Sequence, residues 1–243
     1  MAVQRNLLDL TQPLMTEPLT ALTDYAIALE CLLFAAGLLG RGWVARVWAI
    51  AFGSVGGAAF LGGTLHGFAP QLVWEQRLWL WQGMVLTLAI ASFCILVAVA
   101  LSVPQRWRLG LLILAIAKLI LVLRLDTSPW AFAISVADYL SALTLVLLVQ
   151  LRQFVRQHQG SPKPRPSPDL AWMAAGFATS ALAAIALLIP RRALPLSPLG
   201  VYHLVQMVAL YCIYRSARAM GQVKRRDRTI LQRSRRQSRS RWG

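Results

Sequence analysis

The stretch LWLWQGMVLTLAIASFCILVAVALS, residues 78–102, decides the fold of this chain, because 25 residues pass without one Asp, Glu, Lys, Arg or His. A helix needs about 20 predominantly apolar residues to cross the hydrocarbon core of a bilayer. The composition agrees, with 57% hydrophobic residues, 14% charged residues and a mean hydropathy of +0.56 over 243 residues. These values exclude an ordinary soluble domain and predict an all-α, polytopic membrane protein.

Six further stretches are long and apolar enough to be spans, namely 19–39, 44–66, 109–125, 130–151, 170–189 and 199–215. We therefore predict a bundle of seven transmembrane helices over residues 19–216. The shortest stretch, 109–125, contains Lys118. A proline-rich inner linker, 157–169, separates the first five spans from the last two, and Pro-rich segments of this kind are extended. An outer N-terminal segment, 1–18, precedes the bundle, and a basic cytoplasmic tail, 217–243, follows it.

The charge distribution sets the orientation. With the C-terminus in the cytoplasm, 19 of the 25 Lys and Arg residues fall on the inner side and five on the outer side. Positively charged loops face the cytoplasm, so the pattern predicts an outer N-terminus and an inner C-terminus. Tryptophans near the expected span ends fit the same arrangement, because they favour the membrane interfaces. The cell inner or plasma membrane is the expected location.

The tail also suggests partners. Nine Lys and Arg residues and one acid, Asp227, lie between positions 224 and 243. Such a juxtamembrane cluster either serves as a topology signal or binds anionic lipid head groups. Nucleic acid is the disfavoured partner, because Trp242 is the only aromatic residue among these charges. The bundle itself contacts membrane lipids.

Polar residues inside the predicted spans gather in the outer half of the bilayer. A charge in hydrocarbon is costly, so each such residue is a candidate for function. The ionisable members are Asp24, Glu30, His66, Lys118, Asp138 and His203. Ser135 and Ser141 recur at three-residue spacing around Asp138, and Gln206 shares a helix face with His203, beside Tyr202. The three cysteines fit no metal motif and are interpreted as packing residues.

Two imidazoles and a carboxylate can hold Zn²⁺ with an open position for water. We expect His66, His203 and Asp138 to be metal ligands, with Asp24 or Asp138 as a further ligand or general base. A bound metal would generate a hydrolytic nucleophile near neutral pH. Thr64, Ser135 or Tyr202 would orient a substrate carbonyl. The structural alternative is that the aspartates pair with Lys118 or the histidines, while Lys118 otherwise reaches toward the outer surface.

The segments Leu22-Thr23-Asp24-Tyr25 and Gly62-Gly63-Thr64-Leu65-His66-Gly67 look like those of bacterial seven-span proteins of uncharacterised activity. The span pattern also resembles the superfamily of seven-span hydrolases and receptors that includes alkaline ceramidases and the progestin and adipoQ receptors. That resemblance implies zinc ligands at His66 and His203. The chain departs from the pattern with Gly62 at the serine position and Met207 at the second histidine of the seventh span. The family's aspartate has no clear match, and Glu75 is the nearest acid.

Two functions follow as hypotheses. The favoured one is a metal-dependent hydrolase that acts on a lipid or amphiphile in the outer half of the bilayer. The alternative is a non-catalytic sensor or assembly partner, whose polar cluster is structural and whose tail binds anionic lipid or a partner. An ion pathway is disfavoured, because the inner halves of the spans carry almost no ionisable groups to continue it.

Overall fold

The computed structural model describes residues 15, 17–124, 130–157, 167–190 and 197–239, and in 221–239 only the course of the backbone. Over these residues the chain is all-helical, which confirms the predicted fold class. The α-helices are α2 (Pro18–Leu39), α3 (Trp43–Phe68), α4 (Trp74–Ala100), α5 (Gln105–Arg124), α6 (Ala131–Gln157), α7 (Pro168–Ala186) and α8 (Pro198–Arg239). A short 3-10 helix, η1 (Ala69–Gln71), joins α3 to α4. Most of the predicted segments 1–18 and 157–169 lies outside the described residues.

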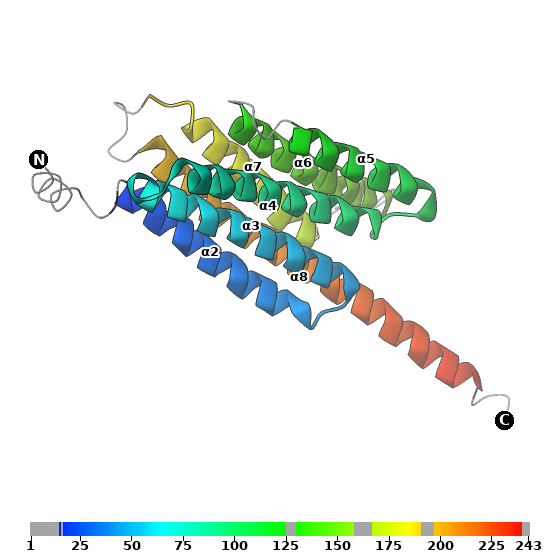
Figure 1. The fold of residues 1–243 in the computed structure, drawn as a ribbon. Coiled ribbons are helices and arrows are strands. Elements are labelled where there is room, and N and C mark those ends of the chain that lie inside the picture. Colours follow the sequence, from blue (N-terminus) through cyan, green and yellow to red (C-terminus); the bar gives the residue numbers. More distant parts are fainter. Residues whose placement is uncertain (1–14, 16, 125–129, 158–166, 191–196, 240–243) are drawn as a thin grey trace, which may run out of the picture.

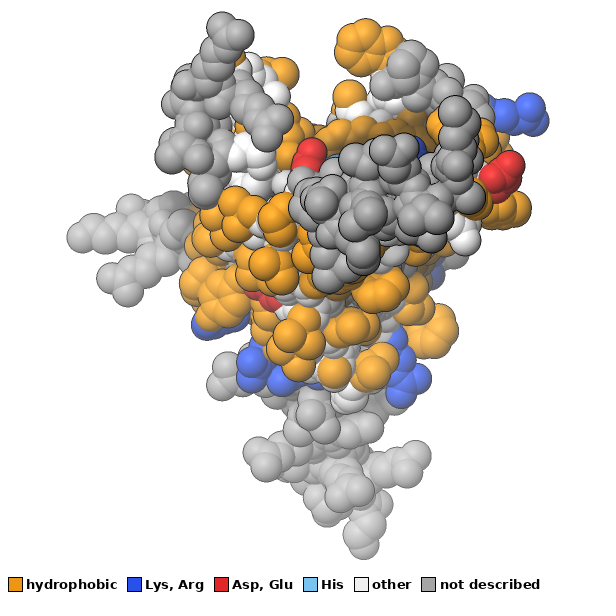
Figure 2. Space-filling model, turned by 60° about the vertical axis from the view of Figure 1, so that its left-hand side comes forward, with side chains coloured by type: hydrophobic (Ala, Val, Ile, Leu, Met, Phe, Trp, Pro, Cys, Tyr) orange, Lys and Arg blue, Asp and Glu red, His pale blue; other side chains and the backbone are white. Residues whose placement is uncertain are grey.

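Among the described residues, five helices are long and apolar enough to cross a membrane, and these are α2, α3 with η1, α4, α6 and α7. Their outward faces carry large apolar side chains: Leu29, Leu33 and Phe60, for example, are 61%, 63% and 56% exposed. Hydrophobic side chains dominate the surface in Figure 2. A lipid-facing surface accounts for this exposure, because a water-soluble protein rarely shows such extensive apolar patches.

Successive helices run in opposite directions, so that α2 and α8 are parallel neighbours (Figure 1). Helix α8 packs against α7, α2 and α3, which closes the bundle between its first and last helices. Pro18, Pro168 and Pro198 begin α2, α7 and α8, at positions where the missing amide hydrogen costs nothing. Gly42 lies in the turn between α2 and α3 and has a φ of +109°, a backbone conformation that residues with a side chain rarely adopt.

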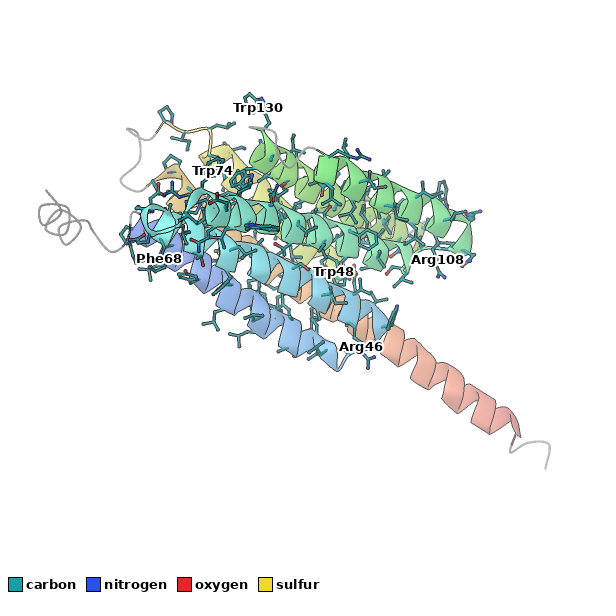
Figure 3. All side chains as sticks on the ribbon, in the orientation of Figure 1. Arg46, Trp48, Phe68, Trp74, Arg108 and Trp130 are labelled. Carbon is teal, nitrogen blue, oxygen red and sulfur yellow. The ribbon has the colours of Figure 1, made fainter. Side chains whose placement is uncertain are left out.

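The core of the bundle is built from large side chains of several helices. Trp48, Leu96, Leu143 and Ile213 are almost fully buried. The rings of Phe34 on α2 and Tyr214 on α8 stack at 4.4 Å. Figure 3 shows the two ends of the molecule: Phe68, Trp74 and Trp130 mark one end, and Arg46 and Arg108 lie toward the other.

Close approach of α2 and α3 depends on glycines of α3. A Cβ at Gly63 would lie 2.9 Å from Asp24 Cβ, and one at Gly56 would lie 3.2 Å from Ala28 O. A Cβ at Gly53, by contrast, would meet nothing within 4 Å. The close contacts at Gly56 and Gly63 bring the backbone of α3 directly against α2, at Ala28 and at Asp24.

Candidate functional site

The first and last helices meet through a buried acid and a buried imidazole. Asp24 Oδ1 on α2 lies 3.3 Å from His203 Nε2 on α8. Both residues are 5% exposed. Burial of these two polar groups is tolerated because each is the hydrogen-bond partner of the other. One proton shared between them leaves the pair without net charge.

Thr23 contacts the other nitrogen of the same ring. Its Oγ1 lies 3.0 Å from His203 Nδ1, and also 3.0 Å and 2.9 Å from the carbonyl oxygens of Leu19 and Thr20. A hydroxyl can donate or accept, so Thr23 can satisfy Nδ1 whether or not that nitrogen carries a hydrogen. Two consecutive residues of α2 therefore hold the ring from both sides and orient its Nε2 toward Asp24.

A cavity of about 220 Å³ opens beside this pair, toward the end of the bundle where α3 ends and α4 begins. Five helices contribute to its wall: α2, α3, α4, α6 and α8. Much of the wall is apolar, with Val55, Met84 and Leu88 among its members. The polar and aromatic lining residues are Asp24, His66, Trp81, Phe132, Tyr139, Tyr202, His203 and Gln206. An apolar hollow with a few convergent polar groups is the usual form of a small-molecule site.

The second carboxyl oxygen of Asp24 faces Gly62, which is itself part of the cavity wall. A Cβ built on Gly62 would lie 3.5 Å from Asp24 Oδ2. This buried oxygen has no hydrogen-bond partner among the described residues. A buried polar atom without a partner costs free energy, so Oδ2 is an unsatisfied hydrogen-bond acceptor of a residue that lines the cavity.

His66 lies in the last turn of α3 and is less enclosed. Its Nδ1 is 3.8 Å from Glu17 Oε2, and the two side chains are 30% and 47% exposed. His66 also lines the cavity, so it lies between the cavity and the end of the bundle. The neighbouring Thr64 is not part of the wall: its hydroxyl donates to Phe60 O at 2.9 Å and lies 3.1 Å from Tyr25 Oη.

Asp138 belongs to a different cluster. Its Oδ1 lies 3.0 Å from Lys118 Nζ, and the ammonium also donates to Asp138 O at 3.0 Å. Ser141 Oγ and Ser92 Oγ accept from the same ammonium at 2.8 Å and 3.3 Å. The Lys118 side chain is 17% exposed. The pairing of Asp138 with Lys118 thus follows the structural alternative, and the lysine reaches into the contact between α4 and α6 rather than toward the surface.

The remaining predicted residues divide into two groups. Tyr202 and Gln206 line the cavity, together with His203. Ser135 donates to Ala131 O at 2.9 Å and is buried away from the wall. Glu30 is not a lining residue either, and its buried Oε2 has no hydrogen-bond partner among the described residues.

These positions do not fit the zinc site expected from the sequence. A catalytic zinc ion takes three protein ligands and leaves one position open. Within the part of the chain that the structure describes, no three His, Cys, Asp or Glu side chains are grouped closely enough to hold a metal ion. Asp138 in particular is not brought together with His66 and His203.

Several contributors were not singled out from the sequence as site residues. Trp81, Phe132 and Tyr139 line the cavity, and Glu17 contacts His66. Aromatic residues in apolar spans give no signal that separates a cavity wall from ordinary packing. For the contact with the His203 ring, the available sequence signal was that two polar residues, Thr23 and Asp24, are adjacent in one turn of a predicted span.

Comparison with known proteins gives a family without an activity. Residues 19–222 match the model of a family of unknown function, DUF6962. No curated protein and no solved structure matches the chain. The matched range includes all the described helices except Pro18 of α2 and the last part of α8, and it contains the Asp24–His203 pair and the lining residues of the cavity. The chain belongs to the DUF6962 family.

Proposed function

We propose that this protein is a membrane-embedded receptor that binds a small amphiphile in the cavity between α2, α3, α4, α6 and α8. The observation that carries the proposal is Asp24 Oδ2, a buried oxygen without a described partner, in a residue that lines a largely apolar cavity. An occupant with an apolar body and one hydrogen-bond donor would fill the cavity and satisfy this oxygen. Asp24, bound to His203 through its other oxygen, would connect the occupant to α8.

The lining residues favour binding over covalent catalysis. No Ser, Thr or Cys belongs to the described wall, so no side chain there has the usual form of a hydrolytic nucleophile. Thr23 contacts His203 but is not a lining residue, and its hydroxyl also lies within reach of two backbone carbonyls.

A hydrolase is the second candidate, supported by the Asp24–His203 pair itself. A carboxyl and an imidazole that share a proton at a cavity wall can accept a proton from a water molecule. The described residues do not supply three ligands for zinc, so this candidate relies on acid–base chemistry of Asp24 and His203 alone.

The membrane arrangement is also part of the proposal. Seven helices cross the bilayer, with the N-terminus outside and the C-terminus inside the inner or plasma membrane. Helix α5 fits a span because its central charge, Lys118, is paired with Asp138. Helix α8 fits one because it packs against α2, α3 and α7 over the length of the bundle. The tail after the last span binds anionic lipid head groups.

The test measures binding of 2-phenylethanol, which has an aromatic body and one hydroxyl, to the protein in phosphatidylcholine nanodiscs. We expect saturable binding in saturation-transfer NMR. Val136→Trp, at a lining position of α6, should abolish it by filling the cavity. Leu148→Trp, at a position 54% exposed on the same helix, is the control and should bind like the unmodified protein. Equal signals from all three proteins would mean partitioning into lipid and would overturn the proposal.

A further inference from the structure

We infer that the occupant of the cavity is a small protonated amine whose apolar body lies against the aromatic wall. This inference rests on the proposed receptor function and names the class of ligand. Three observations on the described residues point to it: Asp24 Oδ2 has no partner among them, none of the lining residues is a lysine or arginine, and four aromatic side chains line the cavity.

The charge of the wall favours a cation. Asp24 is the only acid among the described lining residues, and no Lys or Arg lines the cavity beside it. The Lys118 ammonium is already shared among Asp138, Ser92 and Ser141. A second carboxylate, Glu17, lies 3.8 Å from the lining residue His66. Among the described residues, the wall therefore carries one acid and two imidazoles, with Glu17 beside one of them, and no fixed positive charge.

The aromatic side chains supply the second contact. Trp81, Phe132, Tyr139 and Tyr202 come from α4, α6 and α8. Phe132 and Tyr202 meet edge to face, with ring centroids 6.3 Å apart and an interplanar angle of 76°. Ring faces attract cations, and a carboxylate together with several rings is a recurrent arrangement for ammonium ligands. An alcohol would use Asp24 Oδ2 but would gain nothing from the ring quadrupoles.

Proton balance is compatible with this ligand. In the empty site one proton shared by Asp24 and His203 cancels the charge of the carboxylate. An ammonium group bound at Oδ2 supplies the same cancellation, so the shared proton leaves to solvent and His203 stays neutral. Its Nε2 then donates its hydrogen to Oδ1, and Thr23 donates its own to Nδ1, which the 3.0 Å contact permits. One proton is released for each ammonium bound, and the charge of the site stays zero.

Three probes of similar size separate the possibilities: 2-phenylethylamine, 2-phenylethanol and 3-phenylpropionate. Affinities are measured by titration calorimetry on protein in phosphatidylcholine nanodiscs, and the proton count comes from repeating the amine titration in buffers of different ionisation enthalpy. We expect the amine to bind at least tenfold more tightly than either other probe, with release of about one proton. Asp24→Asn should remove this preference, so that the affinities of the variant for the amine and the alcohol lie within twofold of each other.

Each other outcome has a distinct meaning. Equal affinities for amine and alcohol, or an amine preference that persists in Asp24→Asn, would overturn the amine inference. If the alcohol still bound and Val136→Trp abolished that binding, the receptor proposal would stand without it. If none of the probes showed binding that Val136→Trp removes, both the receptor proposal and the amine inference would be overturned. If Asp24→Asn does not fold, the ratio of amine to alcohol affinity and the proton count in the unmodified protein decide the question.

Discussion

Lys118 of α5 and Asp138 of α6 form an ion pair with 3.0 Å between Nζ and Oδ1, and this pair is a main polar attachment of α5 to its neighbours. Only Ala115 and Val122 of α5 are buried. The lysine therefore does more than neutralise an acid: it holds a weakly packed helix against α4 and α6. This arrangement leads to a first prediction.

Replacing Lys118 with Leu should lower the free energy of unfolding by about 2–4 kcal/mol, because Asp138 would remain as an unpaired carboxylate in the bundle. The double replacement Lys118→Leu with Asp138→Leu should recover at least half of that loss. Leu121→Ala, at a position 56% exposed on α5, is the control and should change stability little. Unfolding in mixed micelles with increasing SDS measures all four proteins. A double variant as unstable as the single one would contradict the pairing.

The contact between α2 and α3 predicts opposite effects for two glycines of one helix. Gly63→Ala should destabilise by about 1–3 kcal/mol, because its Cβ would lie 2.9 Å from Asp24 Cβ and 3.1 Å from Ala21 O. Gly53→Ala, with open space around the new atom, should be neutral or stabilise by up to about 1 kcal/mol. The same SDS titration compares them. Equal effects at both positions would show that α2 does not approach α3 at Gly63.

Asp24 and His203 should behave as coupled residues. A double-mutant cycle with Asp24→Asn and His203→Ala is expected to give a coupling free energy of about 0.5–1.5 kcal/mol, in the range of hydrogen bonds between membrane helices. Thr23→Val should also destabilise, because Nδ1 of the ring loses the hydroxyl that lies 3.0 Å from it. Leu204→Ala, 44% exposed on α8, serves as the control. If the effects of the two single changes on the free energy of unfolding were strictly additive, Asp24 and His203 would not be in contact.

The proposed seven-span arrangement predicts which loops face which side of the membrane. In a variant with Cys31, Cys94 and Cys212 replaced by Ala, a cysteine at position 127 should react with a membrane-impermeant maleimide on intact cells. A cysteine at position 161 should react only after permeabilisation. Both positions lie outside the described residues, so the labelling tests topology rather than any contact. If α5 did not cross the bilayer, the cysteine at 127 would also label only after permeabilisation.

Metal content separates the zinc hypothesis from the receptor proposal. Because the described residues do not group three ligands, we expect protein purified without chelator to contain far less than one zinc ion per chain by elemental mass spectrometry. The comparison proteins are His66→Ala and His203→Ala, which should show the same background. Near-stoichiometric zinc that both changes remove would instead establish the metal-dependent hydrolase.

The helices themselves could be read from the amino-acid order. Each of the seven apolar stretches begins or ends within a few residues of an observed helix, as in 19–39 against α2 and 44–66 against α3. The largest difference is at α8, which continues to Arg239 beyond the predicted span end at 215. The next is at α6, which continues to Gln157 beyond the predicted end at 151. Its last turns carry Arg152, Gln153 and Arg156, and a helix can extend past its apolar part into a polar environment.

The hydropathy of a segment is a local property of the sequence, and for this reason the runs of apolar residues identified the helices and the polar residues that interrupt them. The choice of partner is not local. Asp24 and Asp138 have similar surroundings in sequence, yet one binds His203 and the other Lys118. That outcome depends on which helices are neighbours and how closely their backbones approach. Glycines 56 and 63 bring α3 against α2, α8 closes the bundle beside α2, and the cavity is the space that these contacts leave unfilled.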